Sequence, residues 1–210
     1  MIVSFLHNYI YLRPKKTGSS TIEHVLSKDV GPEDIIAGKK AGRIPGIKNV
    51  DNRFAQLDTH TKATNVKTLV PEQFWSQAYK ISSARHPYEK AVSLAYYRLH
   101  KFEKWGVEDE EKQFSRILDQ VVRSNAYDSF KYYSIDGEVI IDDFIRHESF
   151  EADLRRVAAR IGIAVPDELP KKKQGLRLDP RPASEILSDQ QKGFIVERCK
   201  AEFELLGYKR

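Results

Sequence analysis

Cysteine is almost absent from this chain, which has a single cysteine, Cys199, among 210 residues. One cysteine cannot form an internal disulfide, and it excludes a metal site built from several thiolates. Long hydrophobic runs are also missing, since no window approaches the roughly eighteen apolar residues that a membrane-spanning helix needs. The apolar residues 1–12 lack the basic leader and small-residue cleavage site of an export signal, and they predict a first strand. We therefore expect a cytoplasmic protein.

Charge of one sign is not in large excess either. The formal net charge is +5, from 35 basic and 30 acidic residues, with 40% hydrophobic residues. This balance is typical of a globular protein with a real core, and the length fits one domain. The mild positive charge is compatible with a small polyanionic ligand as well as with nucleic acid, so charge alone does not choose between them. Of the two we expect the small ligand and no nucleic acid partner. Basic residues form one dense cluster, at Lys171, Lys172, Lys173, Arg177 and Arg181.

The most informative segment lies between residues 9 and 26. An apolar run breaks into a loop rich in lysine, glycine and hydroxyl residues, and an apolar pattern of helical spacing follows. This order predicts a strand, an anion-binding loop and a helix from residue 19, because helix N-termini offer unpaired N–H donors. Gly18 allows close backbone approach. The predicted donors are the backbone and side chains of Lys15, Lys16, Thr17, Gly18, Ser19, Ser20 and Thr21.

The loop is not a Walker A sequence. In that motif the lysine and the hydroxyl residue follow the second glycine, whereas Lys15 and Lys16 precede Gly18 here. The inverted order argues against a nucleotide-dependent kinase, which stays an alternative. A second alternative, a non-enzymatic module that binds polyanions, draws only on the net charge and the basic cluster.

A second candidate anion site follows the predicted strand 78–84. Pro87 suits the first turn of a helix, so Arg85 is placed at the carboxyl end of a strand. Ligands of open α/β sheets bind at that edge. Ser93 is eight positions later, about two helical turns on, and its hydroxyl can turn back toward the same edge.

The rest of the chain alternates between strand and helix patterns. Residues 27–58 predict a long excursion, and a turn is predicted at residues 136–137 before a strand at 139–145. Helices are predicted at residues 64–76, 109–122, 150–161 and 182–206. This alternation predicts one α/β domain with a central parallel sheet flanked by helices.

Residues 16–21 (Lys-Thr-Gly-Ser-Ser-Thr) and 85–93 (Arg-His-Pro-Tyr-Glu-Lys-Ala-Val-Ser) together resemble the two cofactor signatures of the sulfotransferase family. Further matches are Thr59-His60, residues 146–154 and residues 203–208. The pattern is most similar to a bacterial branch of the carbohydrate-type sulfotransferases. The resemblance implies a single sulfotransferase domain over residues 1–210, with a P-loop-NTPase-like sheet.

By this resemblance, the donor is 3′-phosphoadenylyl sulfate (PAPS), the product is 3′,5′-adenosine bisphosphate, and no metal is required. The acceptor is a hydroxyl, expected on a carbohydrate or glycolipid. The resemblance implies that Lys16 contacts the bridging and leaving oxygens, and that Arg85 and Ser93 hold the 3′-phosphate. The basic loop that includes Lys172 corresponds loosely to one that covers the same phosphate in relatives.

The chain departs from the family pattern at two positions. Lys90 stands where the family usually has arginine, and Lys15 stands where proline often precedes the loop lysine, with Pro14 one place earlier. The second departure leaves open whether Lys15 or Lys16 faces the sulfate. We favour Lys16, because it directly precedes Thr17.

Transfer of a sulfuryl group to a hydroxyl needs a base, and three residues are candidates. His60 is favoured, because imidazole titrates near neutrality and this histidine resembles the Thr-His element of cytosolic sulfotransferases. Glu23 and His24, one turn beyond the loop, are the alternatives, since some carbohydrate-type members use a glutamate in that region.

Overall fold

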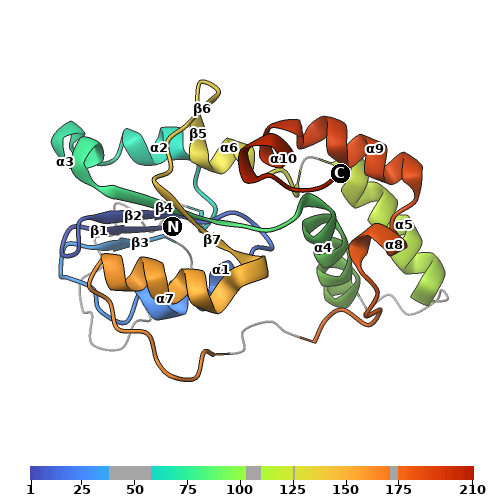
Figure 1. Cartoon of the computed structure of the whole chain (residues 1–210), viewed down its shortest axis with the longest axis horizontal. Coiled ribbons are helices and arrows are strands. Elements are labelled where there is room, and N and C mark those ends of the chain that lie inside the picture. The colour runs from blue at the N-terminus through green and yellow to red at the C-terminus, as the bar shows by residue number, and fades with distance from the viewer. Residues whose placement is uncertain (38–57, 103–109, 125, 171–174) are drawn as a thin grey trace. The chain divides into compact units, whose positions relative to one another are not determined.

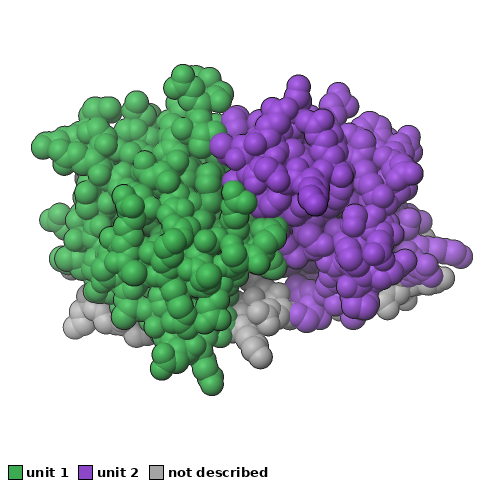
Figure 2. All heavy atoms as spheres, in the orientation of Figure 1, with its two compact units in different colours: residues 1–84, 131–172 green, residues 85–130, 173–210 purple. Residues whose placement is uncertain are grey.

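The computed structural model describes residues 1–37, 58–102, 110–124, 126–170 and 175–210. They belong to two compact units, coloured green and purple in Figure 2. Unit 1 comprises residues 1–84 and 131–172, and unit 2 comprises residues 85–130 and 173–210. Because each unit combines two separate stretches of chain, no single cut in the sequence divides them. One domain over residues 1–210 stays a prediction.

The α/β class is confirmed in unit 1, where a five-stranded sheet is flanked by helices (Figure 1). The sheet is mixed, however, and the prediction of a wholly parallel sheet is wrong. In sheet order the strands are β3 (Ile35–Ile36), β1 (Ile2–Ser4), β2 (Tyr9–Leu12), β4 (Tyr79–Ala84) and β7 (Asp143–Arg146). Strands β2, β4 and β7 run parallel to one another, while β1 is antiparallel to both β2 and β3.

The antiparallel strand arises because residues 1–12 form a hairpin rather than the single strand predicted. Asp34 stabilises the turn, since its carboxylate accepts from Phe5 N–H at 2.6 Å and from the Ser4 hydroxyl at 2.6 Å. Asn8 adopts a left-handed φ of 51°. The turn contains no glycine or proline, and its acidic partner is about thirty positions away, so Asn8 was the one local signal for a turn.

Helices cover both faces of the sheet (Figure 1). On one face, α1 (Ser19–Leu26) and α7 (Phe150–Arg160) pack against the strands. This core joins Ile2, Tyr9, Tyr11, Ile22, Val25, Leu26, Ile81, Ile145, Leu154, Val157 and Ala158. The helix predicted at residues 64–76 is instead two helices, α2 (Ala63–Lys67) and α3 (Glu72–Gln77), on the opposite face. Pro71 separates them, because proline lacks the N–H that a continuous helix needs.

The segment from residue 134 contains the predicted turn. Asp136 and Gly137 have positive φ values of 51° and 85°, as a two-residue hairpin turn requires, and they join β5 (Ser134–Ile135) to β6 (Glu138–Val139). The strand predicted at 139–145 is therefore divided between β6 and β7. A short 3-10 helix, η4 (His147–Ser149), leads into α7.

Unit 2 is helical. Its helices α4 (Pro87–Phe102) and α5 (Glu110–Arg123) confirm the helices predicted after Pro87 and near residues 109–122. The long helix predicted at 182–206 is instead three, because a capping box of Ser188 and Gln191 starts a new helix and another begins after Cys199. The other helices of unit 2 are α8 (Ala183–Ile186), α9 (Asp189–Arg198) and α10 (Lys200–Leu206). The residues of α6 (Phe130–Tyr133) belong to unit 1 except for Phe130. No described helix is long and apolar enough to cross a membrane.

Candidate functional site

The predicted anion loop follows β2 and leads into α1, as expected. Lys16 and Gly18 have left-handed φ values of 62° and 78°, and Gly18 is the N-cap of α1. A Cβ atom at Gly18 would lie 2.7 Å from Cε2 of Phe150, at the start of α7. Glycine is therefore needed here for its backbone conformation and for the close approach of the Phe150 ring.

A buried chain of hydroxyl groups ties the loop to the sheet. Thr17 is fully buried, and its hydroxyl donates to the carbonyl of Pro14 at 3.3 Å. Because that single hydrogen is used, Thr17 accepts from the Ser83 hydroxyl at 2.7 Å, and Ser83 in turn accepts from the Tyr11 hydroxyl at 3.0 Å. The Thr21 hydroxyl likewise donates to the Pro170 carbonyl at 3.1 Å. The hydroxyls of both threonines therefore stabilise the loop, and the expected donation of Thr17 and Thr21 to an anion is limited to their backbone N–H groups.

The two serines are arranged differently, because both contact the buried side chain of Arg13. Its Nε donates to the Ser19 hydroxyl oxygen at 3.1 Å and its Nη2 to that of Ser20 at 2.9 Å. Its Nη1 forms an ion pair with the carboxylate of Glu23. Arg13 is not among the residues predicted for the anion loop. The available signal was a cation at the end of a buried strand, directly before the loop.

His60 lies beside the same arginine. Its Nδ1 is 2.8 Å from the carbonyl oxygen of Arg13, and a carbonyl can only accept a hydrogen bond. Nδ1 therefore carries the proton in the neutral ring, and Nε2 carries the lone pair. The backbone N–H of His60 donates to the Asp58 carboxylate at 3.1 Å, and the Tyr132 ring lies 6.3 Å away between centroids. The favoured base is thus next to the loop and in the tautomer of a proton acceptor.

Electrostatics keep His60 neutral. Burial lowers its pKa to about 4, and the positive charges of Arg13 and Lys15 act in the same direction. The pKa of Asp58 is lowered chiefly by the hydrogen bond from His60, with the charge of Lys15 contributing. The charge of Lys15 acts on both groups, which places Lys15 on the His60 side of the loop. Glu23 is occupied by Arg13, and the third candidate, His24, is exposed.

In unit 2, Arg85 directly follows β4, as predicted, and its Nη2 donates to Glu89 at 3.1 Å. Glu89 also accepts from Arg177 Nη1 at 2.6 Å and from the backbone N–H of Ala183 at 2.8 Å. Burial raises the pKa of Glu89, but the Ala183 hydrogen bond and the two guanidinium charges outweigh it and lower the pKa. Two arginines therefore surround one carboxylate. Ser93 lies on α4 and is half-buried.

Lys90, the residue that departs from the family pattern, has a structural partner in unit 2. Its ammonium is fully buried, 2.6 Å and 2.7 Å from the two carboxylate oxygens of Glu202 and 2.7 Å from the Ser129 hydroxyl. Among the described residues, Glu202 also belongs to the one group with metal-ligand spacing, with Asp128 and Cys199. The ammonium of Lys90 already neutralises that group.

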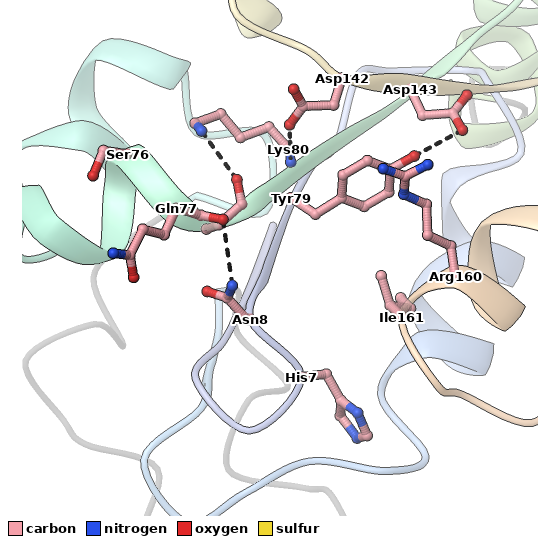
Figure 3. A pocket seen from close by; sticks show the side chains of 11 residues that line it. His7, Asn8, Ser76, Gln77, Tyr79, Lys80, Asp142, Asp143, Arg160 and Ile161 are labelled. Atoms are coloured by element: carbon pink, nitrogen blue, oxygen red, sulfur yellow. Dashed lines mark hydrogen bonds between the residues drawn. The ribbon is translucent and has the colours of Figure 1, made fainter.

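A polar hollow of about 740 Å³ lies elsewhere in unit 1 (Figure 3). It is lined at the amino ends of the parallel strands, where Asn8 precedes β2, Tyr79 begins β4 and Asp143 begins β7. Its acidic groups are engaged, since Asp143 accepts from the Tyr79 hydroxyl at 2.9 Å and Asp142 accepts from Lys80 N–H at 2.7 Å. Among the described residues, none of the predicted site residues lines it.

The structure thus brings most of the predicted residues together within one unit. Lys15, Lys16, Thr17, Gly18, Ser19, Ser20, Thr21, Glu23 and His60 all belong to unit 1. Arg85 and Ser93 belong to unit 2, and Lys172 lies outside the described residues. No protein-family model, curated protein or solved structure matches this chain.

Proposed function

We propose that this protein is a sulfotransferase that moves a sulfuryl group from PAPS to a hydroxyl group of an acceptor. One observation supports the proposal. His60 Nδ1 donates to the backbone carbonyl of Arg13, which leaves Nε2 free to accept a proton, and the Arg13 side chain donates to the hydroxyls of Ser19 and Ser20. A proton acceptor and two hydroxyls that can donate hydrogen bonds to an anion therefore contact the same residue. This is the combination that transfer of an anionic group to an alcohol needs.

The residues of unit 1 have separate parts in this proposal. PAPS supplies the sulfuryl group and a phosphate leaving group. His60 Nε2 accepts the proton of the acceptor hydroxyl. Lys15 and Lys16 balance the negative charge of the transferring group, and the Ser19 and Ser20 hydroxyls donate to its oxygens or to the leaving phosphate. We also propose that the loop binds the phosphosulfate in the manner of a P-loop. It is placed for this role because it follows the carboxyl end of β2, a strand that is parallel to β4.

For unit 2, the proposal assigns the 3′-phosphate to Arg85 and Ser93. The support is the placement of Arg85 at the end of β4 and a guanidinium that can donate two hydrogen bonds to phosphate oxygens. Arg177, which meets Arg85 at Glu89, adds a second positive charge there. The acceptor proposed is a carbohydrate or glycolipid hydroxyl, which rests on the resemblance alone.

Nucleotide binding tests the proposal without requiring the acceptor. We expect calorimetric titration with 3′,5′-adenosine bisphosphate to show saturable binding, and Arg85→Ala to weaken it about tenfold or more, because a hydrogen bond to a charged group is lost. Lys101→Ala, which changes an exposed lysine of the helix α4 that follows Arg85, is the matched control. Absence of binding at millimolar nucleotide would overturn the proposal.

A further inference from the structure

We infer that Arg13 is a positioning residue of the proposed sulfotransferase site, which orients the Ser19 and Ser20 hydroxyls as anion donors and fixes the tautomer of His60. Neither sequence motif includes Arg13. The inference rests on the proposed function for the identity of the anion, but the geometry on which it depends does not.

The hydrogen bonds between Arg13 and the two serines have a fixed direction. A guanidinium can donate but cannot accept, so both serine oxygens accept from Arg13. Each hydroxyl hydrogen must then point to another acceptor. The Thr17 and Thr21 hydroxyls, by contrast, donate to carbonyls of Pro14 and Pro170. The loop and the first helical turn contain four hydroxyl side chains. The Ser19 and Ser20 hydroxyls, which accept from Arg13, are therefore the two that we assign as donors to a ligand.

The Arg13 side chain is held rigidly. Arg13 is 7% exposed, and each of its three side-chain nitrogens has a different partner on α1. A guanidinium is planar, so fixing it at Glu23 also fixes the directions toward both serines. Glu23 therefore serves as the counter-ion of Arg13, and the inference removes it from the candidate bases.

The same arginine contacts the proposed base. The Arg13 carbonyl accepts from His60 Nδ1, so the residue that orients the serines also directs the His60 lone pair to Nε2. The charged groups that act on His60 are Arg13, Lys15 and Asp58. Removing the Arg13 charge removes one of the influences that keep this ring neutral. A change at Arg13 should therefore be detectable at His60 without any ligand.

The first test is a double-mutant cycle on binding of 3′,5′-adenosine bisphosphate. Arg13→Lys keeps the charge but loses the planar fork, and we expect it and Ser20→Ala each to weaken binding about tenfold. Combined, they should weaken it little more than either alone, because Ser20 acts through Arg13. Thr21→Val is the matched control, and its effect should multiply with that of Arg13→Lys. Multiplicative effects for the Ser20 pair would overturn the inference.

Glu23→Gln separates a counter-ion from a base. The amide oxygen still accepts from the guanidinium, so we expect transfer to persist within about threefold, whereas loss of a general base costs about a hundredfold or more. A drop of that size would show Glu23 to be the base and contradict its assignment here.

A third measurement needs no nucleotide and no acceptor. Nitrogen-15 spectra of histidine-labelled protein should show His60 protonated at Nδ1 at neutral pH, and Arg13→Gln should raise its pKa. A His60 ring protonated at Nε2 would overturn the inference even if Arg13→Lys failed to fold. If the spectra agree but the wild-type protein binds no nucleotide, the proposed function fails while the orienting geometry stands.

Discussion

At the scale of single residues, His60 gives the sharpest prediction of pH dependence. Its pKa is about 4 in the folded protein, against 6.5 for an ordinary histidine. The unfolded chain therefore binds more protons between these values, and the contribution of His60 to stability is complete above pH 6.5 and is lost as the pH falls toward 4. We expect His60→Gln to flatten this dependence, measured by urea unfolding at several pH values.

The same pKa bears on the reaction. Because Nε2 keeps its lone pair down to about pH 4, we expect the transfer rate not to fall near pH 6.5. A loss of rate centred at 6.5 would contradict the environment described for His60. His86, which lies in unit 2 and has no part in the proposed reaction, supplies a second histidine whose replacement by glutamine should leave the profile unchanged.

Single residues also show how far the sequence alone could go. The strand, loop and helix around Lys16 and Gly18 could be predicted because strand, glycine and helix signals adjoin in the chain, and anion binding by this loop stays a prediction. The position of Arg13 at a strand end was visible in the sequence, but its contacts were not, because they depend on burial and on the direction of the guanidinium. The same is true of Ser83, whose contact with Thr17 joins positions 66 residues apart.

At the scale of elements, the loop and α7 meet at Gly18. Gly18→Ala places a side chain in a left-handed backbone and against the Phe150 ring, so we expect a loss of about 2 to 4 kcal/mol in the free energy of unfolding. Gly137→Ala is the matched control, since Gly137 has a φ of 85° with open space around it, and should lose about 1 to 2 kcal/mol.

Chemical denaturation of the two variants, side by side, measures the difference. Phe150→Leu combined with Gly18→Ala should recover part of the loss, because it removes the ring but not the backbone strain. Equal losses at Gly18 and Gly137 would contradict the packing of α7 on the loop.

Element boundaries were predicted well where the signal is local. Helix α1 coincides with its prediction, and β4, α4, α5 and α7 lie within one residue or so of theirs at the ends that were predicted. Predictions were wrong where a distant contact or a cap decides. Asp34 makes the hairpin of β1 and β2, and the Ser188 capping box divides the C-terminal helical region. The mixed sheet follows from that one hairpin.

At the scale of the whole molecule, the stability of unit 2 should depend on Lys90 and Glu202, which are both fully buried. Lys90→Met leaves an uncompensated carboxylate in the interior, so we expect a loss of about 3 to 5 kcal/mol in the free energy of unfolding. The double variant Lys90→Met/Glu202→Leu should recover most of that loss, because it removes both charges together.

Urea unfolding monitored by circular dichroism checks this expectation. Lys101→Met, an exposed lysine of the same helix α4, is the control and should change stability by less than about 0.5 kcal/mol. A Lys90→Met variant as stable as the wild-type protein would contradict the buried ion pair.

The central claim concerns the chemistry of unit 1, and transfer of labelled sulfate tests it most directly. We expect purified protein with radiolabelled PAPS and a panel of carbohydrate acceptors to form a labelled sulfate ester, and His60→Ala to slow transfer about a hundredfold or more while binding of 3′,5′-adenosine bisphosphate is kept. Full turnover by His60→Ala would contradict the role of His60. No transfer from PAPS, with phosphoryl transfer from ATP and Mg²⁺ instead, would contradict the account as a whole.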